Sequence, residues 1–150
     1  MGLDRVPFIV ADTVSVDDPY TFDPNVIQLP FDGTPVDVLS VDVCVSHKTQ
    51  IKLDTMAQIA VLGLTMIDQT FEVTYQIIRN DDCVSMISDE MDYDSVVDGR
   101  HMNFPNFPLV DKNPSLGMNT YHLRCTSVIT PTVGFVFVGS RSLKATVFTL

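Results

Sequence analysis

The densest group of residues that could do chemistry is the acidic run Asp89-Glu90-Met91-Asp92-Tyr93-Asp94. Carboxylate oxygens are the hard ligands that Ca²⁺ prefers, although the spacing here does not match an EF-hand loop. Paired carboxylates could also hydrolyse a glycosidic bond. We take Asp89, Asp92 and Asp94 as weak candidate metal ligands, and favour a solvated loop over residues 89–103 as the interpretation of this region.

The three histidines, His47, His101 and His122, lie far apart in the sequence. The chain has no closely spaced His-x-His pair of the cupin type, no GxSxG nucleophile elbow and no glycine-rich phosphate loop. A Ser-His-Asp triad assembles in space rather than in sequence, so that alternative stays open. We expect no catalytic residues and no cofactor, and we predict that the protein is not an enzyme.

The chain has three cysteines, and no CxxC spacing that would indicate zinc. Cys125 has the same strand parity as Tyr121 and Leu123, which predicts that it is buried. Cys44 has the opposite parity to its apolar neighbours, so we expect it to be exposed and to be the candidate for an intersubunit disulfide. The favoured alternative is that Cys44, Cys83 and Cys125 are all reduced thiols.

Composition and charge exclude several classes of protein. The 150 residues suffice for one domain, and 45% of them are hydrophobic, which excludes a disordered chain. The net charge of −10 argues against nucleic acid as a partner, because nucleic-acid binding needs clustered Lys and Arg. No apolar run reaches the roughly 18 residues of a membrane helix, and the N-terminus shows no signal-peptide pattern. We expect no membrane insertion.

Most of the sequence alternates as half-buried strands do. Residues 36–45 and 71–79 place apolar side chains at every second position, and turns with Gly, Pro or Asn separate such runs. Eight to ten strands at this spacing predict an all-β antiparallel sandwich over residues 25–150. The side chains predicted to form its core are those of Leu39, Val41, Val43, Phe71, Val73, Tyr75, Ile77, Tyr121 and Leu123.

Residues 1–24 differ from the rest, being rich in Asp and Pro around the apolar island Phe8-Ile9-Val10. We interpret them as an extended N-terminal arm whose island docks on an adjacent copy by strand addition. The alternative is that this segment folds back as an edge strand of its own domain. Phe135 and Phe137 share one face of a strand; core packing is the favoured interpretation, and an aromatic stripe at a subunit interface is the alternative.

Three segments resemble jelly-roll domains of the tumour-necrosis-factor and C1q type. They are residues 71–81 (FEVTYQIIRND), residues 107–123 (FPLVDKNPSLGMNTYHL) and residues 142–146 (SLKAT). Such domains form heads on bacterial spore-surface proteins and, in a related form, subunits of endospore appendages. The resemblance implies a single jelly roll, an extracellular location on a cell or spore surface, and assembly with copies of itself. The collagen-like stalk and the cysteine-rich N-terminal connector of those proteins are absent here.

These observations predict a structural protein, a self-assembling jelly-roll subunit of an extracellular fibre or surface appendage. One alternative is a closed homotrimeric binding head for a carbohydrate or protein ligand. The other is a structural protein of a virion or phage.

Overall fold

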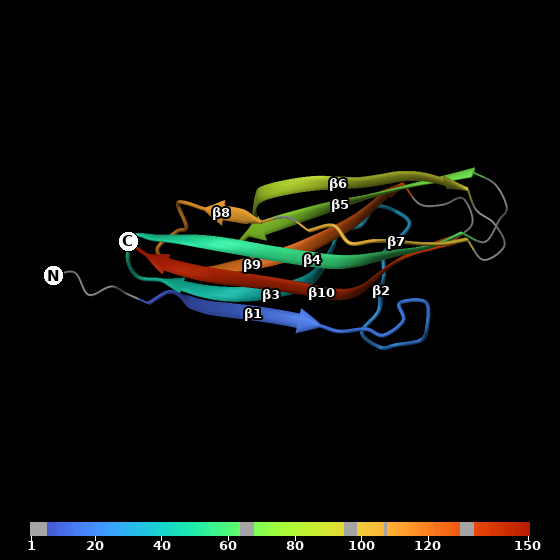
Figure 1. Cartoon of the computed structure of the whole chain (residues 1–150). Coiled ribbons are helices and arrows are strands. Elements are labelled where there is room, and N and C mark those ends of the chain that lie inside the picture. The colour runs from blue at the N-terminus through green and yellow to red at the C-terminus, as the bar shows by residue number, and fades with distance from the viewer. Residues whose placement is uncertain (1–5, 64–67, 95–98, 107, 130–133) are drawn as a thin grey trace.

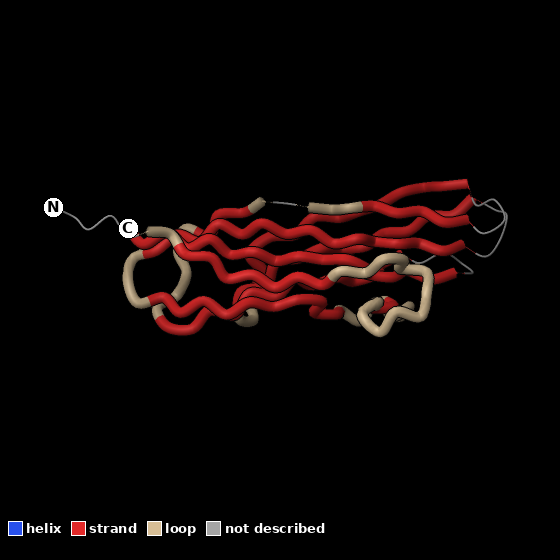
Figure 2. The backbone as a smooth tube through the Cα atoms, turned by 60° about the horizontal axis from the view of Figure 1, so that its bottom comes forward, coloured by secondary structure: helices blue, strands red, loops and turns tan. Residues whose placement is uncertain are grey.

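A computed structural model of the chain describes residues 6–63, 68–94, 99–106, 108–129 and 134–150. Within these residues the protein consists of β-strands and loops, and there is no helix that could cross a membrane. Figures 1 and 2 show an elongated sandwich whose strands run along its length. The strands are β1 (Phe8–Val14), β2 (Ile27–Gln28), β3 (Val36–Val45), β4 (Thr49–Gly63), β5 (Asp68–Arg79), β6 (Asp82–Asp94), β7 (Gly99–Asn103), β8 (Leu109–Asp111), β9 (Gly117–Ile129) and β10 (Gly134–Thr149).

The strands form two antiparallel sheets that face each other (Figure 1). The first sheet has the order β1-β10-β4-β7, with β2 also paired to β10 and β8 also paired to β4. The second sheet has the order β3-β9-β5-β6. Strands that follow one another in sequence thus repeatedly pass from one sheet to the other, which is the arrangement of a jelly roll. The predicted fold class is confirmed.

Apolar side chains at alternate positions of the strands fill the space between the sheets. In β3 and β5 the odd-numbered apolar residues point inward and are buried, while most of the even-numbered residues are exposed or half-buried. All nine side chains predicted for the core are buried, and Tyr75, Tyr121 and Phe71 are the largest that are fully enclosed. The period of two was therefore a reliable guide to the core of these strands.

The turns lie at residues whose types favour turn conformations. Gly117 has φ of +94°, the left-handed region that a glycine adopts at little steric cost, where the chain turns into β9. Asn80 has φ of +54° between β5 and β6, and its side-chain oxygen accepts a hydrogen bond from the Thr120 backbone N–H at 3.0 Å. Both turns lie where the sequence predicts them.

The acidic region differs from its prediction. Strand β6 continues through the acidic run to Asp94, and residues 99–103 form β7, so the described part of residues 89–103 is mostly strand rather than loop. Both strands lie at sheet edges, where side chains on one face and along the free edge meet water. Edge strands tolerate charges that a central strand would exclude, so their polarity resembled that of a loop.

Residues 8–24 do not form a separate arm within the single chain. All seven residues of β1 pair with β10, from Phe8 opposite Val147 to Val14 opposite Arg141. β2 pairs with β10 beyond this point, so β1 and β2 share the same edge of β10 end to end. The unpaired backbone groups of a long edge strand are the physical reason for this pairing. The predicted boundary at residue 24 is corrected, because residues 8–24 belong to the sandwich.

A bulge in β10 separates its pairing with β2 from its pairing with β1. The register to β4 shifts between Val138 and Arg141. The buried Arg141 side chain donates hydrogen bonds to the carbonyl oxygens of Val38 at 2.9 Å, Asn25 at 2.8 Å and Gly139 at 2.8 Å. These bonds fix the bulge and the chain that enters β2, which together position the aromatic residues described next.

Candidate assembly edge and aromatic groove

The first candidate site is the free edge of β1. One side of this strand pairs with β10, and no described strand pairs with its other side. Of the residues predicted to form the assembly interface, Phe8 is 48% exposed and Ile9 is 62% exposed, whereas Val10 is half-buried against the core. The predicted island therefore lies on its own sheet, but two of its three side chains remain in contact with solvent.

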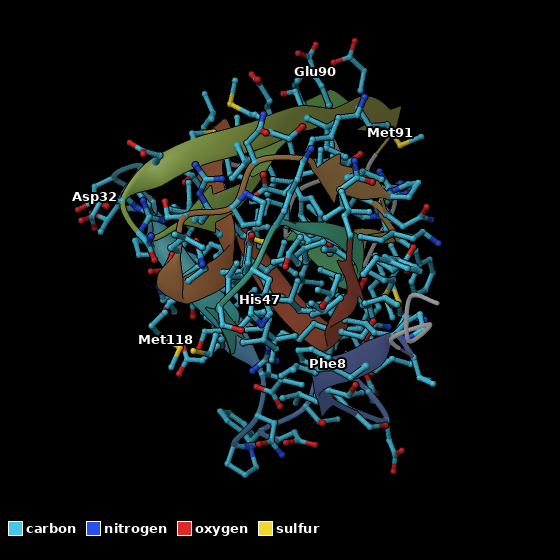
Figure 3. The ribbon with its side chains drawn as sticks, turned by 90° about the vertical axis from the view of Figure 1, so that its left-hand side faces the viewer. Phe8, Asp32, His47, Glu90, Met91 and Met118 are labelled. Atoms are coloured by element: carbon cyan, nitrogen blue, oxygen red, sulfur yellow. The ribbon has the colours of Figure 1, made fainter. Side chains whose placement is uncertain are left out.

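This edge lacks the usual protection against pairing. Natural edge strands carry lysines, prolines or inward charges that discourage association, whereas β1 has the sequence FIVADTV with one aspartate and no lysine or proline. β6, an edge of the other sheet, is strongly acidic. Figure 3 shows Phe8 at one side of the molecule and Glu90 and Met91, on β6, at the opposite side. The two edges therefore differ in their capacity to add a strand.

The second candidate site lies on the outer face of the first sheet, around Phe135 and Phe137. Val136 and Val138 are fully buried, so the two phenylalanines between and before them point outward, and both are half-buried. The core interpretation of this pair is wrong, because Val136 and Val138 occupy the core-facing positions of this strand. The two rings form an outward-facing aromatic stripe, and its role at a subunit interface stays a prediction.

A strap formed by residues 15–24 covers part of the same face. The Ser140 hydroxyl accepts a hydrogen bond from the Val16 N–H at 2.9 Å and donates one to the Val16 carbonyl at 3.1 Å. Further along, the Tyr20 hydroxyl lies 3.2 Å from the Val61 carbonyl oxygen and 3.0 Å from that of His101. The strap thus crosses from β10 over β4 to β7 and brings its own aromatic residues beside Phe137.

The strap and β10 together enclose an aromatic groove. The Phe135 and Phe137 rings stack with centroids 5.8 Å apart, and Tyr20 meets Phe137 edge-on at 6.4 Å. Phe31 leans on Phe135 at 5.9 Å. The hollow has a volume of about 370 Å³ and is lined by Tyr20, Thr21, Phe22, Asp23, Val26, Gln28, Leu62, Phe135 and Phe137.

The groove has one charged residue among those that line it, Asp23. Its Oδ1 accepts a hydrogen bond from the Asn25 backbone N–H at 2.8 Å. The Arg100 guanidinium carbon, which is not among the atoms lining the groove, lies 4.6 Å from the centroid of the Tyr20 ring, a cation–π contact. The groove therefore combines phenyl rings with a carboxylate, and contains no basic side chain of its own.

The acidic candidates for a metal site do not come together. Asp89 stands opposite the buried Val73 and points into the sandwich, whereas Asp92 is exposed and, two residues before Asp94, has the opposite parity to Asp89. The side chain of Asp94 lies outside the described residues. No group of three metal-ligating side chains occurs among those described. Asp89 and Asp92 lie on opposite faces because a strand sends alternate side chains to opposite faces.

Asp89 instead belongs to a hydrogen-bonded chain between the sheets. The Asn103 side-chain amide donates to Asp89 Oδ1 at 2.6 Å, and Asn103 Oδ1 lies 2.9 Å from His101 Nε2. Because Asp89 is on β6 and Asn103 on β7, this chain braces the two sheets at one open side of the sandwich. His47 is exposed near the β3–β4 turn, and His122 lies 3.8 Å from Asp37, so the three histidines stay apart.

The cysteines lie as the strand parity predicts. Cys125 is fully buried, and burial raises the pKa of its thiol to about 12. Cys44 and Cys83 are exposed. Cys44 is therefore accessible to a second molecule, and its disulfide to a neighbouring subunit stays a prediction.

The aromatic groove is the candidate site that the sequence alone does not predict. Tyr20 and Phe22 lie in a segment with no strand pattern, and nothing in their spacing relates them to Phe135. The available signal was the pair Phe135 and Phe137, whose outward orientation depends on the phase of β10.

No family model and no curated protein matches this sequence. Its fold, however, is similar to solved structures. In the crystal structure of the infectious bursal disease virus VP2 subviral particle, the match has a TM-score of 0.51 at 16% identity, over 93% of this chain and 32% of that one. The structure of the Gx strain of the same virus gives a TM-score of 0.50 at 16% identity, over 95% and 33%.

The chain thus spans about a third of the length of these structures. At this level of identity the likeness establishes the jelly-roll class of the domain and nothing finer. The resemblance to tumour-necrosis-factor and C1q domains stays a prediction.

Proposed function

We propose that this protein is a structural subunit that assembles with copies of itself through the free edge of β1. The observation that carries the proposal is an unguarded edge of seven residues with Phe8 and Ile9 exposed beside it. A strand added to this edge would pair with its free backbone groups, and alternate side chains would fix the register. Burying one apolar side chain of this size contributes roughly 1.5–3 kcal/mol at best. A contact between two copies buries Phe8 and Ile9 of each subunit, so four such contributions add together.

The geometry of the edge limits what it can build. Two copies that join β1 to β1 in antiparallel fashion use the same surface twice, which gives a closed twofold dimer. A fibre or a shell needs a second, different contact in addition. We therefore propose that β1 makes the first contact of a larger assembly.

The finer form of the assembly has two candidates. A fibre on a cell or spore surface follows from the resemblance stated above. A closed shell is favoured by the fold comparison, because the two structures compared above are of a virus and one is a subviral particle. The acidic charge of this chain disfavours a shell whose subunits bind nucleic acid directly.

The test places lysines on the free edge. The double variant Ile9→Lys with Thr13→Lys changes two exposed positions of β1, where lysine discourages strand pairing. The matched control is Met118→Lys with Val128→Lys, which adds the same charge at two exposed positions of β9, inside the opposite sheet. We expect the β1 variant to be monomeric by light scattering and to form no particles in negative stain, while the control assembles like the unmodified chain.

Equal assembly of both double variants would overturn the proposal. Loss of assembly in the control alone would place the contact on the outer face of the second sheet instead. If the unmodified protein assembles, negative-stain images separate a fibre, a closed shell and a discrete trimer.

A further inference from the structure

We infer that the aromatic groove binds a cationic side chain, an arginine or lysine that a partner protein presents. This inference concerns the outer face of the first sheet and does not depend on assembly through β1. It is carried by the chemistry of the residues that line the groove.

The groove offers the two features that recognise an organic cation. The first is a set of aromatic faces: Phe135 and Phe137 stack at 5.8 Å, and Tyr20 stands at 89° to Phe137. The negative face of an aromatic ring attracts a cation, which is the interaction that binds ammonium groups in aromatic cages. A neutral apolar ligand would use the same rings, so the second feature decides between them.

That second feature is the carboxylate of Asp23. One of its oxygens, Oδ1, accepts the hydrogen bond from the Asn25 backbone N–H. The other, Oδ2, has no hydrogen-bond partner among the described residues. The other lining residues are uncharged, and no lysine or arginine neutralises Asp23 inside the groove. A guanidinium bound there would donate to this oxygen while it stacks on a phenyl ring, which is the arrangement arginine favours.

The molecule already shows this chemistry at one ring that lines the groove. Arg100 stacks on the Tyr20 ring at 4.6 Å, so a ring of this aromatic set holds a guanidinium in the free chain. The net charge of −10 further attracts cationic and repels anionic ligands. The volume of about 370 Å³ is at the small end of ligand sites, which suits one side chain rather than an extended peptide.

Phe22 indicates where the partner would extend. Its side chain lines the groove and is fully exposed, at 108% of the reference value. A large apolar group on the rim gains by being covered. We therefore expect the cationic residue to be flanked by apolar residues, one of which covers Phe22.

The test uses the full chain and two peptides of nearly the same shape, of which only one carries a positive charge. The probe is acetyl-Leu-Arg-Leu-amide, and its neutral isostere is acetyl-Leu-citrulline-Leu-amide. We expect the arginine peptide to shift the NMR signals of Phe135 and Phe137 with a dissociation constant on the order of millimolar. The citrulline peptide should bind roughly two- to fivefold more weakly, and added salt should remove most of the difference.

Three variants test whether the preference arises in the groove. Asp23→Asn retains an acceptor for the Asn25 turn but removes the charge, and should reduce the preference for arginine to near unity. Asp32→Asn is the matched control, because Asp32 accepts from the Thr34 N–H at 2.9 Å in an equivalent turn outside the groove. Equal binding of the two peptides, or the same loss in both variants, would overturn the inference, as would unchanged affinity in Phe137→Leu.

Discussion

At the scale of single residues, the cysteines show how strand parity controls reactivity. Cys125 lies fully inside the core with a pKa raised to about 12 by burial, so almost none of it is thiolate at neutral pH. Cys44 and Cys83 are exposed on the surface. We predict that a maleimide reagent at pH 7.5 modifies two thiols of the folded protein quickly, and the third after unfolding.

Intact mass measured against time tests this prediction and also the proposed role of Cys44. A covalent dimer under non-reducing denaturation should disappear in Cys44→Ser and persist in Cys83→Ser. Fast modification of Cys125 in the native protein would contradict its placement in the core, and a dimer that survives Cys44→Ser would contradict the intersubunit disulfide.

A surface ion pair makes part of the stability dependent on pH. Arg124 donates to both carboxylate oxygens of Asp37, at 2.6 and 3.1 Å, and these bonds hold the pKa of Asp37 below its ordinary value. Because the folded-state pKa is the lower one, the contribution is present above about pH 4 and is lost as the pH falls further. We predict that Asp37→Asn is less stable than the unmodified protein at pH 7 and that the two converge towards about pH 3.

Urea unfolding at several pH values in dilute protein measures this effect. About a third of each side chain is exposed to solvent, so we expect a small difference. Arg124→Gln should show the same convergence because it removes the other partner. A constant difference from pH 3 to pH 7 would show that Asp37 acts through packing and not through its charge.

At the scale of elements, β1 contributes to the stability of its own sheet. It pairs along its whole length with β10, and its Val10 and Val14 side chains pack against the core. Deleting residues 1–14 exposes the edge of β10 and removes the contacts of Val10 and Val14 with the core. We predict a protein that still unfolds cooperatively but melts roughly 5–10 °C lower, since a loss of about 1 kcal/mol lowers the melting temperature of a domain of this size by about 2–4 °C.

Circular dichroism during heating measures this change. An unchanged melting temperature would mean that β1 is dispensable to its own domain, as expected of a true arm. Deletion of residues 1–7 alone is the control, because it leaves every paired residue of β1 in place.

The sequence predicted the central strands well and the edges poorly. The strand at residues 36–45 matches β3 at both ends, and strand parity alone placed Cys125 and Tyr121 inside the core. β1 was predicted as part of an arm because Pro7 and Pro19 flank it, and the acidic second half of β6 was predicted as a loop because its charge follows solvent exposure and not backbone pairing. The groove could not be predicted, since it depends on where residues 15–24 cross a sheet formed by residues far away in the sequence.

At the scale of the whole molecule, the two open sides of the sandwich differ in their charge and in their exposed apolar residues. On one side β6 and β7 are braced by the Asp89–Asn103–His101 chain, and β6 carries a row of acidic side chains. On the other side lies β1, with exposed apolar residues and little charge. The molecule thus repels association on one side and permits it on the other, which favours an ordered contact over random aggregation.

The net charge of −10 opposes that contact between any two copies. Charge repulsion acts over a Debye length of about 30 Å at about 10 mM salt and about 10 Å at about 100 mM salt. We predict that assembly through β1 increases over this range of salt, because screening reduces the repulsion while the apolar and backbone contacts of the edge are kept. Sedimentation velocity at fixed protein concentration measures the assembled fraction.

The variant Ile9→Lys with Thr13→Lys separates this effect from general salting out. If screening acts on the β1 contact, the variant should stay monomeric across the whole range although its net charge is closer to zero. Assembly that decreases as salt is added would show instead that attraction between opposite charges holds the subunits together.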